Sequence, residues 1–418
     1  MATLFSVVFL VALALSSFLR IWLALRQHRH VQGHRAAVPA EFVDRIPLAD
    51  HQKAADYTVA KIKLGLAELA LDVLLLLALT FGGILATLDG FWRAQLESTG
   101  LTHGLALFAS LGVISFVVGL PGSLYRTFIL EARFGFNKMT AGLYLADLVK
   151  QLVLTVLIGG PLLLAVLWLM GAMGEYWWFY VWAVWLGFNL LVLLLYPTFI
   201  APLFNKFSPL PEGEMKARIE ALLARCSFAS SGLFVMDGSK RSAHGNAYFT
   251  GFGKAKRIVF FDTLLEKLAP GEVEAVLAHE LGHYKRRHII QRIIMMSVMS
   301  LALLWLLGQL IDQPWFYAAL NVGASVDTMG TAMALILFSL VLPVFSFPFS
   351  PLFSWLSRRH EFEADAYASH QASRDDLITA LVKLYRDNAA TLTPDPLHSL
   401  FYDSHPPASV RIAHLRAC

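Results

Sequence analysis

Seven stretches of almost entirely apolar sequence constrain this chain more than any other feature. Each is about 20 residues long, the length that an α-helix needs to cross the hydrocarbon core of a bilayer. They lie near 3–25, 64–88, 101–122, 149–171, 176–200, 289–311 and 328–350. Only 15% of the residues are charged, against about a quarter in a soluble globular protein. The sequence therefore predicts a predominantly α-helical, polytopic membrane protein with seven transmembrane helices.

Lys and Arg occur almost only in alternate connecting segments. The segments that carry them are 26–63, 123–148, 201–288 and 351–418. The other connections, 89–100, 172–175 and 312–327, hold Arg93 alone. The positive-inside rule makes the basic side cytoplasmic, with the amino terminus outside. The first apolar run has no basic segment before it and no small-residue cleavage site, so we expect it to be a retained span rather than a signal peptide.

The connecting segments divide the chain into four parts. Residues 1–200 hold the first five spans with their cytoplasmic loops, and 289–350 hold the last two. Residues 201–288 are predicted to form a small α+β unit, and 351–418 a carboxyl-terminal segment. In the α+β unit, 214–226 has helical periodicity, and 233–237, 246–251 and 257–262 are typical of short strands. A further helix is predicted to start near Pro270 and to continue into the sixth span.

The predicted helix that leads into the sixth span contains the sequence HELGH at 279–283. His279 and His283 are four residues apart and therefore point the same way, as two ligands of a tetrahedral zinc ion do. Glu280 is placed to act as a general base toward a water molecule at the metal. Gly282 leaves room for a close approach beside the metal. The pattern is fairly specific for a hydrolytic zinc site, although two solvated histidines on a basic helix give the same letters.

A third zinc ligand is expected from SRRHEFEADAYASH at 357–370. Two membrane crossings separate it from His283, so both segments lie on the same side. Glu361 and Asp365 share one helix face, whereas Glu363 points away and is expected to be solvated or salt-bridged. Helical geometry thus favours Glu361 and Asp365, one as the ligand and the other as an acceptor that orients a ligand histidine. It leaves open which residue has which role.

These motifs resemble the CAAX prenyl protease 1 family of integral-membrane zinc endopeptidases. The resemblance extends in matching order through 120–140, 200–214, 238–265 and 404–412. It implies seven helices around a chamber, with a small zincin-like α+β catalytic unit and its single Zn²⁺ at the cytoplasmic end.

The resemblance also implies a role for each matching residue. The family pattern E-x-x-x-D implies that Glu361 is the third ligand and that Asp365 lies behind the ligands. The pattern H-P-P-x-x-x-R falls on His405 and Arg411 and implies that both face the scissile carbonyl.

The short predicted strand that begins at Asn246 is a candidate substrate-binding element. An extended peptide can add to such an edge through main-chain hydrogen bonds. Asn246, Ala247 and Tyr248 are therefore predicted to hold the substrate, a use that the resemblance implies for Asn246. An ordinary edge strand without this role is the alternative.

Glu68 and Asp72 share one face of the second apolar run. An ionised carboxylate facing lipid is costly. Either this face lines a water-filled space between the helices, or the two carboxylates lie near the inner interface and pair with Lys61 or Lys63.

Together these features predict a membrane-embedded zinc metalloendopeptidase that cuts near the carboxyl end of CAAX-type or other membrane-associated peptides. A quality-control membrane protease without prenyl specificity is the second hypothesis, and a channel or receptor with a structural metal is the third. The expected partners are a peptide or lipidated peptide and the bilayer, without nucleic acid, and a monomer is compatible with the sequence. The expected membrane is the inner membrane of a bacterium or the endoplasmic reticulum of a eukaryote.

Overall fold

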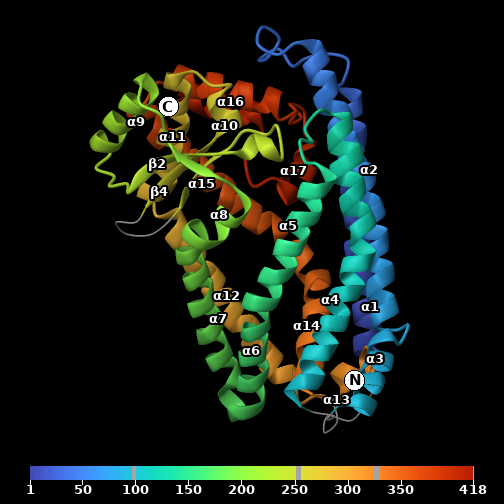
Figure 1. Cartoon of the computed structure of the whole chain (residues 1–418). Coiled ribbons are helices and arrows are strands. Elements are labelled where there is room, and N and C mark those ends of the chain that lie inside the picture. Colours follow the sequence, from blue (N-terminus) through green and yellow to red (C-terminus); the bar gives the residue numbers. More distant parts are fainter. Residues whose placement is uncertain (97–99, 251–255, 324–329, 418) are drawn as a thin grey trace.

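Long helices form the lower part of the molecule, and a mixed α+β unit lies on top of them at one end (Figure 1). The computed structural model describes residues 1–96, 100–250, 256–323 and 330–417. Residues 328–329 of the predicted seventh span and Gly251 of a predicted strand lie outside this described part. In it, six helices are long and apolar enough to cross a membrane, and the number is seven when a bent pair of helices is counted as one span. The upper count agrees with the seven predicted spans, and the predominantly helical membrane fold is confirmed.

The spans are built from the following helices. The first is α1 (Ala2–Gly33), and the bent pair is α2 (Leu48–Leu79) and α3 (Ile84–Gln95), with 49° between them. The next are α4 (Leu101–Tyr125), α5 (Ala141–Leu154) with α6 (Gly160–Ala172), and α7 (Trp177–Leu195). Short π-helical segments follow α4, α5 and α7 at Arg126–Glu131, Thr155–Gly159 and Tyr196–Ile200. The last spans are α12 (His288–Leu310) and α14 (Thr331–Ser346), joined through α13 (Pro314–Ala319).

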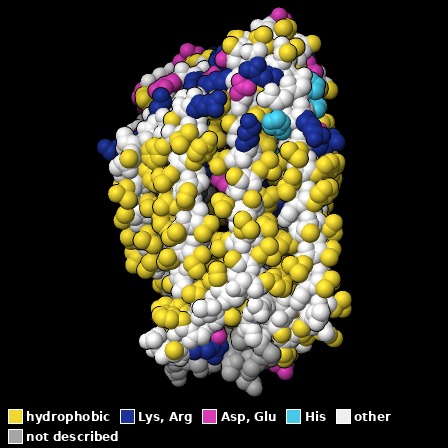
Figure 2. Space-filling view, turned by 90° about the vertical axis from the view of Figure 1, so that its right-hand side faces the viewer, with side chains coloured by type: hydrophobic (Ala, Val, Ile, Leu, Met, Phe, Trp, Pro, Cys, Tyr) yellow, Lys and Arg dark blue, Asp and Glu magenta, His cyan; other side chains and the backbone are white. Residues whose placement is uncertain are grey.

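A belt of apolar side chains surrounds the helical part. Figure 2 shows this belt on the face formed by the right-hand side of Figure 1, with Lys and Arg gathered along its upper border. Large apolar side chains in the belt are exposed, among them Phe18, Val113, Leu157 and Val298 at 62–67%. Such exposure would be unfavourable in water and is expected where hydrocarbon is the solvent.

The α+β unit contains a four-stranded sheet of order β1-β2-β4-β3. Its strands are β1 (Phe207–Pro209), β2 (Gly232–Met236), β3 (Ala247–Thr250) and β4 (Arg257–Phe261). β2 and β4 are parallel, and the other two pairs are antiparallel. The three predicted strands are thus present within a residue of their expected ends, and β1 is additional. The helices of the α+β unit are α8 (Ala201–Phe204), α9 (Glu214–Arg225), α10 (Asp262–Leu265) and α11 (Pro270–Lys285).

The helix that carries HELGH does not continue into the sixth span, contrary to the sequence prediction. α11 begins at Pro270, as expected, and Glu272 caps it by accepting a hydrogen bond from the Ala269 amide at 2.8 Å. It ends at Lys285, and Arg287 then adopts a left-handed backbone conformation with φ of 58°. α12 starts afresh at His288. The break turns the chain, so the residues after it do not follow the helical periodicity of α11.

The carboxyl-terminal segment returns to the α+β unit from the seventh span. α14 contains Pro343, and a 3₁₀ turn at Phe347–Phe349 separates it from α15 (Ser350–Gln371). Pro348 lies within this 3₁₀ turn and thus coincides with the change of helix type, as helix-breaking residues do. α16 (Arg374–Asp387), α17 (Pro396–Tyr402) and α18 (Ala408–Ala417) complete the chain. α9, α11, α16 and the sheet share one hydrophobic core.

A cavity of about 740 Å³ lies between α1, α2 and the carboxyl-terminal segment. Glu68 and Asp72 both line it, which agrees with the first of the two alternatives for these carboxylates. Glu68 also accepts hydrogen bonds from Nη2 of Arg126 at 2.7 Å, so its partner is neither Lys61 nor Lys63. The α2 carboxylates therefore line a cavity between the helices and the carboxyl-terminal segment.

Candidate active site

Helices α11 and α15 approach each other closely because Gly282 has no side chain. A Cβ atom at this position would lie 2.8 Å from Cα and 3.0 Å from the carbonyl oxygen of Ala364. The obstacle is backbone, which cannot rotate away. The space that Gly282 was predicted to leave beside the metal is thus filled by α15. This contact brings the acidic residues of α15 next to the histidines of α11.

His279, His283 and Glu361 form a group that could hold a metal ion. Their ligand atoms all lie within 4.8 Å of one another. Nε2 of His279 is 3.2 Å from Nε2 of His283, and these nitrogens lie 3.5 and 3.3 Å from the two carboxylate oxygens of Glu361. Oε2 of Glu361 is buried and has no hydrogen-bond partner among the described residues. Two imidazole nitrogens and an unsatisfied carboxylate oxygen, all directed at one point, are suited to a divalent cation.

Asp365 and Arg411 lie on the far side of His279. Oδ1 of Asp365 accepts a hydrogen bond from Nδ1 of His279 at 2.8 Å, which leaves Nε2 free. Nε and Nη2 of Arg411 donate to the same carboxylate at 2.9 and 2.5 Å. Burial lowers the pKa of His279, but its contacts with Asp365 and Glu361 outweigh burial and raise that pKa to about 9. The surroundings of His279 thus stabilise positive charge at the metal-binding group.

His288 and Glu363 support His283 in the same way, an arrangement that the sequence did not predict. Nδ1 of His283 lies 3.0 Å from Nδ1 of His288, whose Nε2 lies 3.2 Å from Oε2 of Glu363. The ring of His288 also stacks on His360, with centroids 3.9 Å apart. Glu363 is paired with Arg359 at 3.0 Å, as its expected surface position suggested. No periodicity could reveal this contact, because the left-handed Arg287 sets the direction of His288.

A cavity of about 530 Å³ opens in front of the metal-binding group. Its lining includes Glu280, Asn246, Ala247, Arg411 and His405. Tyr248, the third predicted substrate-binding residue, does not line it. β3 is the last strand of the sheet, so its outer edge has no partner strand among the described residues, and Ala247 at its start lines this cavity.

His405 lies where the catalytic cavity meets the larger cavity between α1 and α2. It lines both, and its side chain is 62% exposed. Its Nε2 is 3.4 Å from Oε1 of Glu361. Arg358 holds the preceding turn, because its Nη1 donates to the carbonyl oxygens of Ser399 and Asp403 at 3.0 and 2.9 Å. Of the three guanidinium nitrogens of Arg411, only Nη1 is not bound to Asp365. It lies 3.4 Å from Oε2 of Glu361.

The close helix contact gives a direct prediction for Gly282→Ala. Because the added methyl group meets the backbone of Ala364, α11 and α15 must move apart. We expect the free energy of unfolding to fall by about 1–3 kcal/mol, as for overpacking in other cores. We also expect peptidase activity to fall about 100-fold, since a displacement of 1 Å has that effect on positioned groups. Gly271→Ala, which meets only the Asp376 carboxylate, is the matched control. Equal activity of the two variants would contradict this assignment.

Comparisons with known proteins agree with this geometry. Residues 27–206 match the family model described as CAAX prenyl protease N-terminal, five membrane helices, and residues 209–418 match Peptidase family M48. A CAAX prenyl protease 1 homolog of Arabidopsis thaliana is 36% identical over 385 residues, covering 90% of this chain and 89% of the relative. The Homo sapiens homolog is 34% identical over 386 residues, with 81% and 80% covered.

A solved structure extends the likeness to the whole fold. The crystal structure of S. mikatae Ste24p superposes with a TM-score of 0.90 at 31% identity, and 98% of each chain is covered. The match thus includes both the membrane helices and the α+β unit with its HELGH helix. The chain therefore belongs to the CAAX prenyl protease 1 family and is an integral, multi-pass membrane metalloendopeptidase of the M48 class.

Proposed function

We propose that this protein is a zinc endopeptidase that cuts near the carboxyl end of lipidated, CAAX-type peptides at the cytoplasmic surface of its membrane. The observation that carries the proposal is the convergence of His279, His283 and Glu361 at a cavity that also holds Glu280. The names of the relatives support the substrate class.

His279, His283 and Glu361 would hold the Zn²⁺ ion. Two imidazoles and a carboxylate are the donor set of a hydrolytic zinc site, and the unsatisfied Oε2 of Glu361 fits it. A bound Zn²⁺ would polarise the scissile carbonyl and activate a water molecule for attack. Asp365 and His288 would keep the two imidazole rings oriented with Nε2 toward the ion.

Glu280 would accept the proton of the attacking water and return it to the leaving nitrogen. His405 and Nη1 of Arg411 would donate hydrogen bonds to the developing oxyanion. Arg411 has a second task, since its other nitrogens fix the Asp365 carboxylate.

The peptide would add as a further strand beside β3, whose residues Asn246, Ala247 and Tyr248 are the proposed substrate-binding residues. Asn246 already joins β3 to β4, because its carbonyl oxygen accepts from the Phe261 amide at 3.0 Å. Its amide oxygen accepts from the Ala247 amide at 2.8 Å, which fixes the side chain at the entrance to the strand. A lipid attached to the peptide would extend past His405 into the larger cavity.

Removal of the metal should abolish activity reversibly. Dialysis against a chelator is expected to reduce peptidase activity to background, and stoichiometric Zn²⁺ should restore it, because only the bound ion supplies the Lewis acid. Metal analysis of the wild type should give one Zn²⁺ per chain, and His279→Ala should give none. Full activity of the metal-free protein would exclude the proposed chemistry.

A peptide panel separates the proposed function from general membrane-protein turnover. Purified protein is given a farnesylated CAAX peptide, the same peptide without lipid, and an unfolded membrane-protein segment. The proposal predicts that the farnesylated peptide has the highest kcat/KM, because its lipid occupies the adjoining cavity. Equal cleavage of all three would favour the quality-control alternative.

The proposed topology follows the distribution of Lys and Arg, with the amino terminus outside and the catalytic unit on the cytoplasmic side. In this topology, residues 1–200 hold five spans, 201–288 form the catalytic unit, 289–350 hold two spans, and 351–418 carry the third ligand. The membrane would be the inner membrane of a bacterial cell or the endoplasmic reticulum of a eukaryotic one.

A further inference from the structure

A third cavity, separate from the two described above, lies among the helices. It measures about 600 Å³ and is bordered by α1, α2, α4 and the segment that follows α4. Its floor is apolar and includes Val59, Ala60 and Leu64, whereas Lys63 and Arg133 lie at its rim with Tyr125 and Gln32. None of these residues belongs to the lining of the catalytic cavity.

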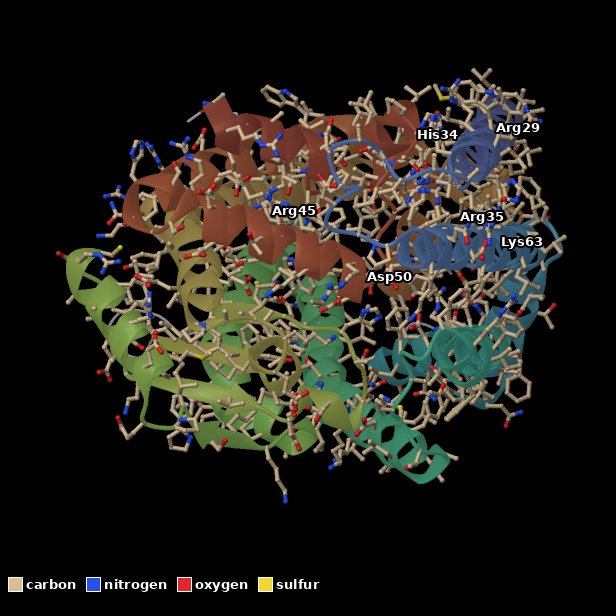
Figure 3. All side chains as sticks on the ribbon, turned by 90° about the horizontal axis from the view of Figure 1, so that it is seen from above. Arg29, His34, Arg35, Arg45, Asp50 and Lys63 are labelled. Atoms are coloured by element: carbon tan, nitrogen blue, oxygen red, sulfur yellow. The ribbon has the colours of Figure 1, made fainter. Side chains whose placement is uncertain are left out.

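This cavity lies at the level where the apolar windows end. Lys63 directly precedes the second window, which starts near residue 64, and Tyr125 follows the third, which ends near 122. Gln32 lies beyond the first window, which ends near 25. Residues at these positions belong to the headgroup region on the side of the catalytic unit. Figure 2 shows the dark blue Lys and Arg side chains along this border, and Figure 3 shows Lys63 and Arg35 at one outer corner of the molecule.

The cavity carries a net positive charge. Its one acidic residue, Asp56, is neutralised by Arg35, whose Nε and Nη2 donate to it at 2.8 Å each. Lys63 and Arg133 form no ion pair within the described residues, and the Arg133 guanidinium lies 5.6 Å from the ring of Phe134. Two cations thus remain available at the rim.

The face of α2 below the cavity is suited to an acyl chain. Ala60, Lys63, Ala67, Leu71 and Leu74 follow one another at spacings of three and four residues and therefore form one stripe along the helix. Leu71 and Leu74 are 46% and 63% exposed. One side of α2 is thus basic at the membrane surface and apolar farther into the bilayer.

We propose that this cavity binds a phospholipid with a net negative headgroup, such as phosphatidylglycerol. Lys63 and Arg133 contact the phosphate, Tyr125 and Gln32 offer further hydrogen-bond donors, and the acyl chains follow Leu71 and Leu74. The cationic rim disfavours headgroups such as phosphatidylcholine, whose own positive charge would face the two side chains. The site is thus a lipid site distinct from the protease cavity.

The bound lipid would brace a segment that supports the substrate strand. Glu131, two residues before Arg133, accepts a hydrogen bond from the Tyr57 hydroxyl at 2.6 Å. Farther along, the Phe136 carbonyl accepts from the Ala243 amide at 3.1 Å, three residues before Asn246. A lipid that fixes Arg133 therefore stabilises the loop against which residues 241–243 lie.

Lipid retention by the purified full-length protein tests the proposal without any peptidase readout. The protein in detergent is incubated with equal amounts of phosphatidylglycerol and phosphatidylcholine, and the lipids retained after washing are counted by mass spectrometry. A cation near an anionic surface strengthens binding roughly fivefold. Lys63→Gln with Arg133→Gln should therefore lower phosphatidylglycerol retention roughly 25-fold. Lys216→Gln with Arg218→Gln on α9 removes the same charge away from the cavity and should leave retention unchanged.

Each outcome decides the question. Preferential retention of phosphatidylglycerol by the wild type and the α9 variant, lost in the cavity variant, supports the site. Equal retention by the cavity variant, or no preference over phosphatidylcholine, overturns it. Displacement of the lipid by excess inorganic phosphate would show a general anion site instead. Because both substituted side chains are exposed, an unchanged melting temperature is expected and serves as the folding check.

Discussion

Glu280→Gln is expected to lower kcat by about 100- to 10,000-fold, the usual contribution of a general base. Glutamine has nearly the same shape as glutamate but cannot accept a proton at neutral pH. Glu280 points into the catalytic cavity and is not part of the metal-binding group, so the substitution leaves His279, His283 and Glu361 intact. The zinc content of the variant should therefore equal that of the wild type. Single-turnover kinetics on the preferred peptide, together with metal analysis, measures both quantities.

Glu274→Gln is the matched control for this variant. It makes the same change on the same helix, but Glu274 pairs with Arg218 and Arg225 on the side that faces α9. Its activity should remain within a factor of two of the wild type. A Glu280→Gln variant with full zinc content and undiminished kcat would exclude Glu280 as the general base.

Arg411→Met is expected to reduce both stability and metal affinity. Asp365 is fully buried and Arg411 is 5% exposed, so the substitution leaves a carboxylate inside the protein without its cation. Breaking a buried ion pair in this way costs about 3–5 kcal/mol. Burial lowers the pKa of Arg411, but the contacts with Asp365 outweigh burial and raise that pKa. The two charges thus stabilise each other. Loss of an outer hydrogen-bond partner should also weaken zinc binding about 10- to 100-fold.

Two further variants make this result interpretable. Arg218→Met removes an exposed arginine that pairs with Glu214, and its stability should change by less than about 0.5 kcal/mol. Asp365→Asn combined with Arg411→Met removes both charges, and this double variant should unfold at a higher temperature than Arg411→Met alone. An Arg411→Met protein as stable as the wild type would contradict the buried pair.

The bilayer spans and half of the site could be predicted from local sequence. A window of about 20 apolar residues has few alternatives to a transmembrane helix, because backbone groups in hydrocarbon must bond within the same segment. The i, i+4 spacing of His279 and His283 likewise fixes their common direction within one helix. The strands at 233–237 and 257–262 are short apolar runs close to turn-forming residues, a pattern that can be recognised before their partners are known.

The prediction for residues after Lys285 failed for an identifiable reason. The sequence predicts one continuous helix into the sixth span, but one left-handed residue, Arg287, ends α11 and redirects the chain before His288. Arginine carries no local signal for that conformation, which the surrounding packing must impose. Consequently the contacts of His288 with His283 and Glu363 could not be foreseen.

The sequence by itself determined where the chain crosses the membrane, which residues of HELGH share a face, and that Glu361 and Asp365 share another. Only the tertiary structure decided how these faces meet: Gly282 admits the backbone of Ala364, so that Glu361 lies before both imidazoles and Asp365 behind one of them. The physical reason is that helical spacing depends on neighbours within one turn. The contact of α11 with α15 depends instead on the packing of segments that two membrane crossings separate.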